Sequence, residues 1–84
     1  MTSKEMFNAD LFREFFAIKK DTPQALAAAI RVSERTLKGR MERRTAWKLE
    51  EIRVIAERWK LHPGTVNVLF FNDGRPVAYI VPAL

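Results

Sequence analysis

Residues 31–44 carry a dense group of positive charges. Six bases stand there against two acids, Glu34 and Glu42, a net charge of +4 in fourteen residues. The bases are Arg31, Arg35, Lys38, Arg40, Arg43 and Arg44. Cations clustered in this way are typical of a surface that binds nucleic-acid phosphates, because each neutralised phosphate releases counterions. The pattern is also compatible with a solvated helix face on which Glu34 pairs with Lys38, or Lys38 with Glu42.

Few other residues could do chemistry. The sequence has no cysteine and one histidine, His62, which stands beside Pro63 and is expected in a loop or a helix cap. It contains no glycine-rich phosphate loop, metal-ligand cluster or nucleophile and base pair. Trp47 and Trp59 could stack on the bases of a single strand, but their positions favour packing at the edge of a hydrophobic core. We therefore expect no catalytic activity, no metal and no cofactor.

Size and composition limit the fold that can position these residues. The 84 residues amount to 9.8 kDa, carry a net charge of +5 with a pI of about 10.1, and are 48% hydrophobic. A chain this short buries only about 60% of its unfolded surface, which predicts one domain without a deep substrate pocket. Charged residues interrupt the N-terminal apolar stretch, and no run of about 18 apolar residues occurs. We expect a soluble, intracellular protein without a signal peptide.

Apolar spacing and capping residues predict four short helices. A stripe of apolar residues at helical spacing follows Asn8, which is a candidate N-cap. Thr22, with Pro23 at the first helical position, and Ser33 are candidate caps for the next two helices. The predicted helices cover residues 9–20, 23–30, 34–42 and 48–60. Short helices with tight links predict a bundle.

The C-terminal part allows two interpretations. Val66 and Phe70 share a face of a short helix, which would add a fifth element to the bundle. Residues 65–81 also contain strand-forming side chains around residues 72–75, whose sequence Asn-Asp-Gly-Arg resembles a hairpin turn. We favour the helix followed by an extended tail. Residues 76–84 carry no charged side chain, so this tail is expected to pack on its own domain or on a second subunit.

Residues 22–38 have the spacing of a helix-turn-helix. The apolar side chains expected to join the two helices are Leu26, Ile30, Val32 and Leu37. Ala27 is small where the helices are expected to cross, because a bulky residue there would change the angle at which the second helix enters a DNA groove. The predicted fold is all-α: a bundle of four to five helices containing a helix-turn-helix, with an extended or β-hairpin C-terminal tail.

This segment resembles the helix-turn-helix of phage Cro and CI repressors, which implies a lambda-repressor-like fold. The resemblance continues through residues 41–52, Met-Glu-Arg-Arg-Thr-Ala-Trp-Lys-Leu-Glu-Glu-Ile, which look like the loop and next helix of that family. It ends at Phe70-Phe71, a pair that is frequent in small Cro-like proteins of phages from Gram-positive bacteria. The resemblance covers residues 8–71.

The chain departs from the family pattern at three positions. Arg31 stands where the family usually has a glycine in the turn, and Arg43 where a glycine often ends the recognition helix. Pro23 replaces a glutamine that often contacts DNA. The alignment also places Gly39 inside the third helix, where a glycine costs about 1 kcal/mol relative to alanine.

The resemblance implies that residues 34–42 form a recognition helix in the major groove of operator DNA. Base edges would face the residues at and near its start, Ser33, Glu34, Arg35 and Lys38. Arg35 would hold the two acceptors of a guanine, and Glu34 would either accept from a cytosine amino group or only stabilise the helix N-terminus. Phosphates would be held by Gln24, Arg40, Arg43 and Arg44, and Thr36 could reach either.

Two functions follow from this resemblance. The first is sequence-specific binding of double-stranded DNA by a phage-type transcriptional regulator in the cytoplasm of a bacterial host. It would act as a homodimer, because one recognition helix reads only a few base pairs. Residues 1–71 would form the DNA-binding domain, and Trp59, Phe70, Phe71 and the tail over residues 72–84 would support dimerisation. The alternative is a modulator or antirepressor that binds a phage repressor protein through the tail or the basic helix.

Overall fold

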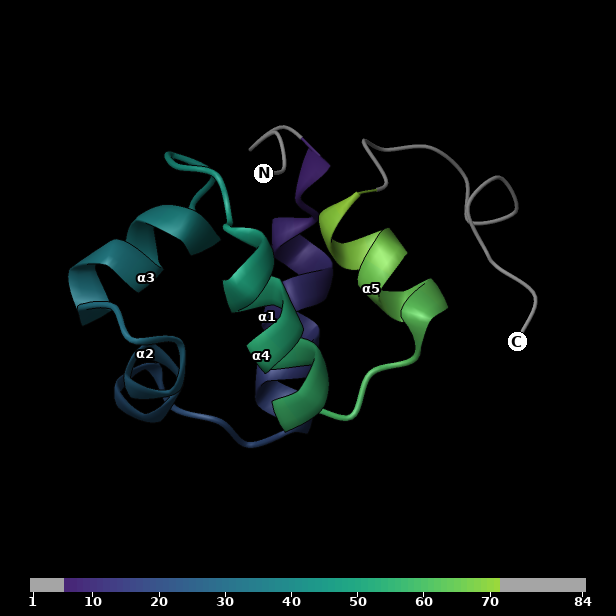
Figure 1. Ribbon diagram of the computed structural model, residues 1–84, viewed down its shortest axis with the longest axis horizontal. Coiled ribbons are helices and arrows are strands. Elements are labelled where there is room, and N and C mark those ends of the chain that lie inside the picture. Colours follow the sequence, from purple (N-terminus) through teal and green to yellow (C-terminus); the bar gives the residue numbers. More distant parts are fainter. Residues whose placement is uncertain (1–5, 72–84) are drawn as a thin grey trace.

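The computed structural model describes residues 6–71, which fold into five helices (Figure 1). These helices are α1 (Ala9–Ile18), α2 (Pro23–Ile30), α3 (Glu34–Met41), α4 (Leu49–Arg58) and α5 (Pro63–Phe70). The described residues contain no strand. All four helices predicted from apolar spacing are therefore confirmed, and their ends differ from the predicted ends by two residues at most.

Side-chain caps explain where the first three helices begin. The amide oxygen of Asn8 accepts a hydrogen bond from Leu11 N at 3.0 Å. The hydroxyl of Thr22 accepts from Ala25 N at 3.1 Å, and that of Ser33 accepts from Thr36 N at 3.0 Å. Each bond satisfies a backbone donor that the helix leaves unpaired, which stabilises the helix by about 1 kcal/mol. The three predicted caps are confirmed.

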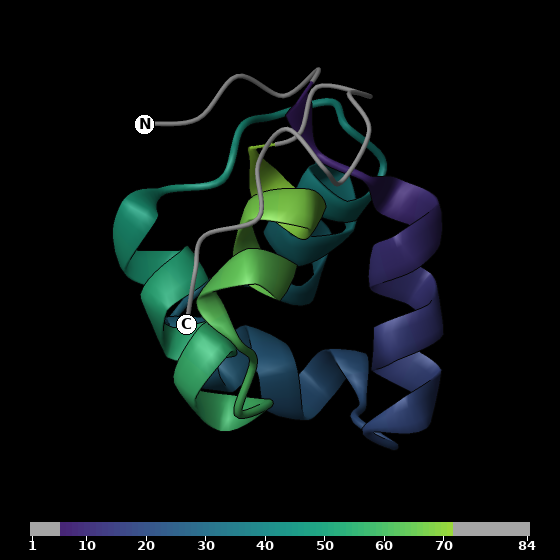
Figure 2. The same cartoon turned by 90° about the vertical axis from the view of Figure 1, so that its right-hand side faces the viewer.

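The helices pack around one core. α2 lies against α3 and α4, and α5 lies against α1 and α4. Figure 2 shows α1 standing along one side of the molecule, with α2 running across its foot toward α4. A hydrogen bond from Asn8 N to Leu69 O, 2.8 Å long, joins the start of α1 to the end of α5.

Aromatic side chains fill the centre of this core. Trp47 and Phe12 are completely buried, and their ring centroids lie 5.3 Å apart. Trp59 is 2% exposed and its ring lies 5.0 Å from that of Phe12. The expectation that both tryptophans lie at the edge of the core was wrong. Trp47 follows an irregular loop in the sequence, and only the folded chain places that loop over α1 and α5.

The C-terminal part of the described chain is helical. Residues 63–70 form α5, so the hairpin interpretation is wrong for residues 66–70. Phe70 is completely buried against Trp47 and Phe7, with ring centroids 5.4 and 5.6 Å away. Trp59 and Phe70 therefore belong to the core of one chain, which corrects their assignment to a dimer interface. The apolar tail predicted for residues 72–84 lies outside the described residues.

Basic residues in the left-handed conformation follow each of the first four helices. Their φ values are 53° for Lys20, 62° for Arg31, 64° for Arg43 and 54° for Lys60. This conformation costs a non-glycine residue about 1 kcal/mol, but it lets the chain turn sharply while cations lie near the negative ends of the helix dipoles. Arg31 and Arg43 thus adopt a backbone conformation that glycine would favour.

Candidate nucleic-acid interface

α2 and α3 are joined by a turn of three residues, 31–33. In Figure 1, α2 is seen nearly along its axis while α3 runs across the view. Leu26, Ala27, Ile30 and Leu37 are buried between these helices and the rest of the core, and Val32 packs against it partly buried. The predicted burial of these apolar residues is therefore confirmed. They attach one face of α3 to the core and leave its other face at the surface.

The turn depends on an arginine in a backbone conformation suited to glycine. Arg31 has φ 62° and ψ 45°, and its N–H donates to Ala28 O at 3.2 Å. Val32 N then donates to Ala27 O at 3.0 Å. These two bonds satisfy carbonyls at the end of α2 and direct the chain into α3.

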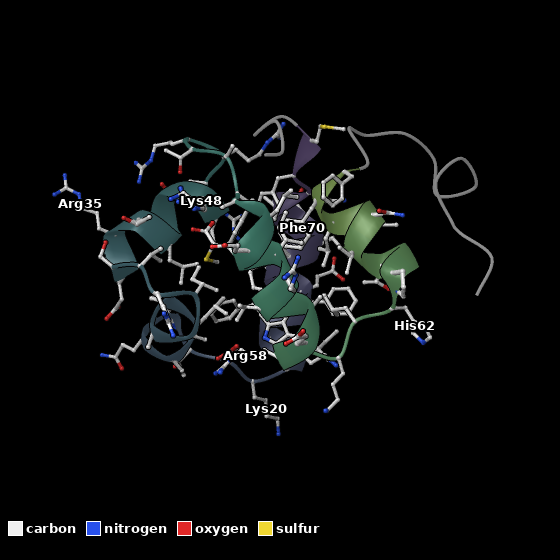
Figure 3. The ribbon with its side chains drawn as sticks, viewed as in Figure 1. Lys20, Arg35, Lys48, Arg58, His62 and Phe70 are labelled. Atoms are coloured by element: carbon white, nitrogen blue, oxygen red, sulfur yellow. The ribbon has the colours of Figure 1, made fainter. Side chains whose placement is uncertain are left out.

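The start of α3 presents the predicted base-reading side chains to solvent. Glu34, Arg35 and Lys38 are exposed, and neither Arg35 nor Lys38 forms an ion pair with another residue in the range 6–71. The side chain of Arg35 extends away from the molecule (Figure 3). Glu34 and Lys38 do not form the ion pair that a solvated helix face would favour.

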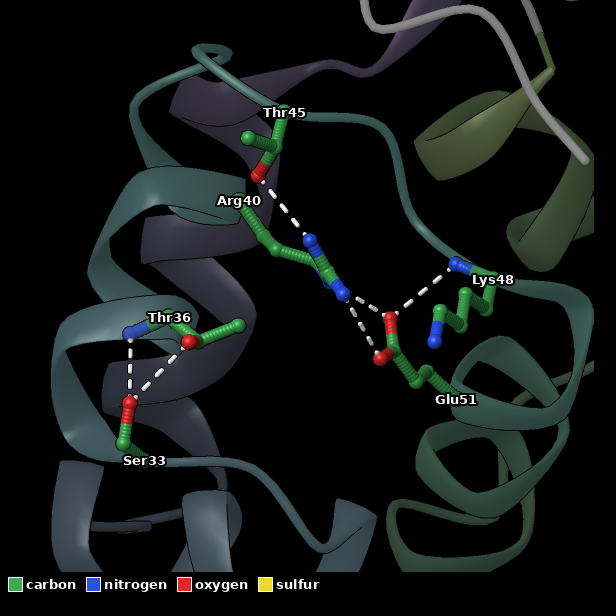
Figure 4. Close-up of polar contacts among 6 residues, drawn as sticks. All are labelled: Ser33, Thr36, Arg40, Thr45, Lys48 and Glu51. Atoms are coloured by element: carbon green, nitrogen blue, oxygen red, sulfur yellow. Dashed lines mark hydrogen bonds and ion pairs between the residues drawn. The ribbon is translucent and has the colours of Figure 1, made fainter.

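Ser33 and Thr36 bond to each other at the beginning of α3. The Ser33 hydroxyl donates to Thr36 Oγ1 at 3.0 Å while it accepts from the backbone N–H of the same residue (Figure 4). Thr36 is half-buried, and Ser33 is exposed. Ser33 therefore uses its only proton on Thr36 and one lone pair for capping, which leaves an acceptor site for the amino group of a base but no donor for a phosphate.

Arg40 does not lie where a phosphate contact was expected. It is 8% exposed, and its Nε and Nη2 donate to the two carboxylate oxygens of Glu51 at 2.7 and 3.1 Å (Figure 4). Its Nη1 donates to Thr45 Oγ1 at 3.0 Å, and Glu51 Oε1 also accepts from Lys48 N at 3.0 Å. A guanidinium with this set of bonds is occupied inside the protein. Its predicted role as a phosphate ligand is corrected to a link between α3, the following loop and α4.

The loop after α3 carries two exposed arginines, Arg43 and Arg44. Arg44 N donates to Gly39 O at 2.9 Å, and Arg43 N donates to Arg40 O at 3.2 Å. The guanidinium of Arg44 lies 3.1 Å from a carboxylate oxygen of Glu42 in an exposed ion pair. These bonds fold the loop back on the last turn of α3. Gln24, the remaining predicted phosphate ligand, is exposed in the first turn of α2.

Some exposed cations of the basic segment line one of two hollows. One, of about 480 Å³, lies between α1 and α3 and includes Arg35 and Lys38 among its lining residues. The other, of about 520 Å³, lies between α2 and α4 and includes Arg31, Lys48 and Arg53. Arg31 thus does not line the hollow that Arg35 and Lys38 share, and Arg40 is buried. The six basic residues of the segment do not form one continuous surface.

Arg13 is a cation that the sequence reasoning missed. It belongs to α1, yet it lines the same hollow as Arg35 and Lys38. Residues 1–30 have equal numbers of acids and bases, so a count of charge along the chain gave no reason to select it. Its position on the polar side of α1, beside the buried Phe12, is the only signal that the sequence offers.

An acidic residue fixes the start of α2 against α4. The carboxylate of Asp21 accepts from Arg58 Nε at 2.8 Å, Arg58 Nη2 at 2.9 Å and Trp59 Nε1 at 2.7 Å. Mainly because Arg58 donates to it, the pKa of Asp21 is lowered to about 2, and the bonds from Trp59 and Thr22 N act in the same direction. The pKa of Arg58 is raised by the same pair. This cluster holds the link between α1 and α2 in place.

No family model matches the chain, and no curated protein or solved structure shows a significant match to it. Among residues 6–71, no helix has both the length and the apolar character that a membrane span requires. The same residues bring no three potential metal ligands of the His, Cys, Asp and Glu types together.

Proposed function

We propose that the protein is a sequence-specific binder of duplex DNA and acts as a transcriptional regulator of the Cro and repressor type. In this proposal α2 and α3 form a helix-turn-helix and α3 is the recognition helix. The observation that carries the proposal is that α3 is held by Leu37 on one side and displays Arg35 and Lys38 on the other, neither of which has an ion-pair partner among residues 6–71. An exposed helix with cations at its start suits the width of the major groove.

The proposed roles follow from side-chain chemistry and position. Arg35 offers two parallel donors to the O6 and N7 acceptors of a guanine, and Glu34 can accept from the amino group of a cytosine. Lys38, one helical turn after Glu34, reaches the same groove. Arg43 and Arg44 follow the end of α3 and Gln24 lies in the first turn of α2. These three side chains would hold phosphates, which position the protein without reading sequence.

Binding as a homodimer remains part of the proposal, because an eight-residue recognition helix reads too few base pairs to be specific alone. The dimer contacts would have to exclude Trp59 and Phe70, which are buried within one chain. The operator would then contain two half-sites related by twofold symmetry.

The test is selection of a duplex from a random pool at a stated salt concentration, followed by binding measurements on variants. We expect the double substitution Arg35→Ala and Lys38→Ala to weaken binding to the selected duplex by roughly 100-fold or more. A matched control removes two exposed cations outside α3, Lys19→Ala and Arg53→Ala, and should retain the sequence preference. Both double variants should unfold at the same denaturant concentration as the parent to within a small shift, because all four side chains are exposed.

The same measurements distinguish the proposed function from the alternative function. If the parent shows no salt-dependent binding to any duplex, or if the Arg35 and Lys38 variant binds the selected duplex as tightly as the parent, the proposal is wrong. The antirepressor alternative, in which this fold binds a repressor protein, would then be tested by co-purification with the repressor of the same phage or prophage.

A further inference from the structure

The hollow between α1 and α3 has the shape and the charge of a groove. Its volume is about 480 Å³. Pro23, Leu37 and Met41 form an apolar part of its lining. The charged residues of the lining are Arg13, Arg35, Lys38, Glu34 and Glu42. Cations from two different helices therefore line one groove together with apolar side chains and two carboxylates.

The positive charge of this groove is available to a ligand. Glu42 forms an exposed ion pair with Arg44 at 3.1 Å, and Glu34 also lines the groove, so three cations of the lining stand against two carboxylates. Arg13 lies 3.5 Å from Asp10, but the two side chains are 58% and 94% exposed, and such pairs contribute little in water. Arg35 and Lys38 have no ion-pair partner among the described residues. Arg13 can thus turn toward an anion without displacing Arg35 or Lys38 from the base edges.

We propose that this groove holds the sugar–phosphate backbone of one strand of bound DNA, with Arg13 of α1 as a phosphate-binding residue. The inference rests on the proposed function and extends the interface beyond α2 and α3. A strand whose base edges meet Arg35 must carry its backbone past the side of α3, and this groove runs along that side. Deoxyribose is compatible with the apolar lining residues, while phosphates require the cations.

Arg13→Gln tests the inference, because it removes one charge and keeps a long polar side chain with good helix propensity. The probe is a short fluorescent duplex of random sequence, titrated between roughly 50 and 200 mM salt. We expect the slope of log affinity against log salt to decrease by about 0.9, as for the loss of one phosphate contact. Arg13→Lys should retain the parental slope. Arg53→Gln, the same change in the hollow between α2 and α4, should also leave it unaltered.

A second measurement locates the contact on the DNA. Ethylation of single phosphates in the selected duplex should identify one position at which ethylation weakens the parent but no longer weakens Arg13→Gln. If the parent binds with a salt-dependent affinity and Arg13→Gln keeps both the slope and the ethylation pattern, this inference is wrong while the proposed function stands. If the parent does not bind duplex DNA, both are wrong. Tighter binding of a polyglutamate peptide than of duplex at equal salt would assign the groove to an acidic protein segment instead.

Discussion

A guanidinium can bind a phosphate when it is exposed, whereas a buried guanidinium must already have a partner. Arg40 and Arg35 are five residues apart in one basic segment, and they fall on opposite sides of this division. Arg40 forms a bidentate pair with Glu51, and Arg35 remains in solvent. Residue type alone therefore does not define which cations of the segment are free to bind an anion.

The cost of breaking the Arg40 pair can be measured. Glu51→Gln leaves the guanidinium buried without its counter-charge, so we expect the free energy of unfolding to fall by about 3 kcal/mol in urea denaturation. Glu50→Gln, the same change at the exposed neighbouring position, should alter it by less than about 0.5 kcal/mol. Equal effects of the two substitutions would show that the buried pair contributes no more than a surface charge.

Asp21 makes the stability of the fold depend on pH in the acid range. Its pKa is about 2 in the folded chain and near 3.9 in an unfolded one, so the ionised carboxylate stabilises the fold above about pH 4. That contribution is lost as the pH falls toward 2. We expect Asp21→Asn to lower the free energy of unfolding at pH 6 by about 1–2 kcal/mol and to lose much of the difference from the parent at pH 2. Thermal unfolding of the parent and of Asp21→Asn across this pH range checks both predictions. A stability difference between the two proteins that does not change with pH would contradict the role of the charge.

At the scale of elements, α3 depends on its neighbours for its helical structure. It has eight residues, fewer than the roughly 12–15 that a helix needs to be stable alone in water, and it contains a glycine. The Ser33 cap, the buried Leu37 and the Arg40 pair hold its beginning, middle and end. The loop of residues 42–48 is in turn fixed by bonds to Gly39 and Glu51.

Gly39 offers a way to stabilise α3 without changing its surface. A Cβ at this position would meet Thr45 Oγ1 at 3.6 Å and Arg44 Nε at 3.9 Å, which are ordinary contact distances. We expect Gly39→Ala to raise the free energy of unfolding by about 1 kcal/mol in urea denaturation, because alanine has the better helix propensity. The reverse change at an exposed helical position of α2, Ala28→Gly, should lower it by a similar amount. A loss of stability in Gly39→Ala would mean that the loop after α3 cannot accommodate a methyl group.

At the scale of the whole molecule, two groups of residues connect distant parts of the chain: an aromatic core and a positively charged surface. The core brings together Phe7 before α1, Trp47 before α4 and Phe70 at the end of α5. The surface combines Arg13 of α1 with cations of α3. Each group contains residues that are distant in sequence. A substitution that destabilises the core should therefore also disturb the relative positions of the surface cations.

A substitution of Phe70 distinguishes a role in the core of one chain from a role in a dimer interface. We expect Phe70→Leu to lower the free energy of unfolding by about 1–3 kcal/mol, because the smaller side chain leaves part of a buried site unfilled. The oligomeric mass in sedimentation equilibrium should not change, because the ring is completely buried within one chain. If Phe70→Leu lowered the oligomeric mass and left the free energy of unfolding unchanged, Phe70 would belong to a dimer interface.

The sequence by itself determined the local features of this protein. Apolar spacing and the caps at Asn8, Thr22 and Ser33 predicted the first four helices, because these signals act between residues three or four positions apart. By contrast, the sequence marked Arg31 and Arg43 only as departures from a glycine pattern, and their left-handed conformations became known from the structure. The choice between a helix and a strand at residues 66–70 was weaker, because the same apolar residues suit both.

Only the tertiary structure decided where the charges and large aromatic rings lie. Arg40 meets Glu51 eleven residues away, and Arg13 reaches the groove of α3 from a segment without net charge. Trp47 lies at the centre of the core instead of at the expected edge for the same reason. Burial and ion pairing depend on which distant segments pack together, and this packing is not contained in the spacing of residues along one helix.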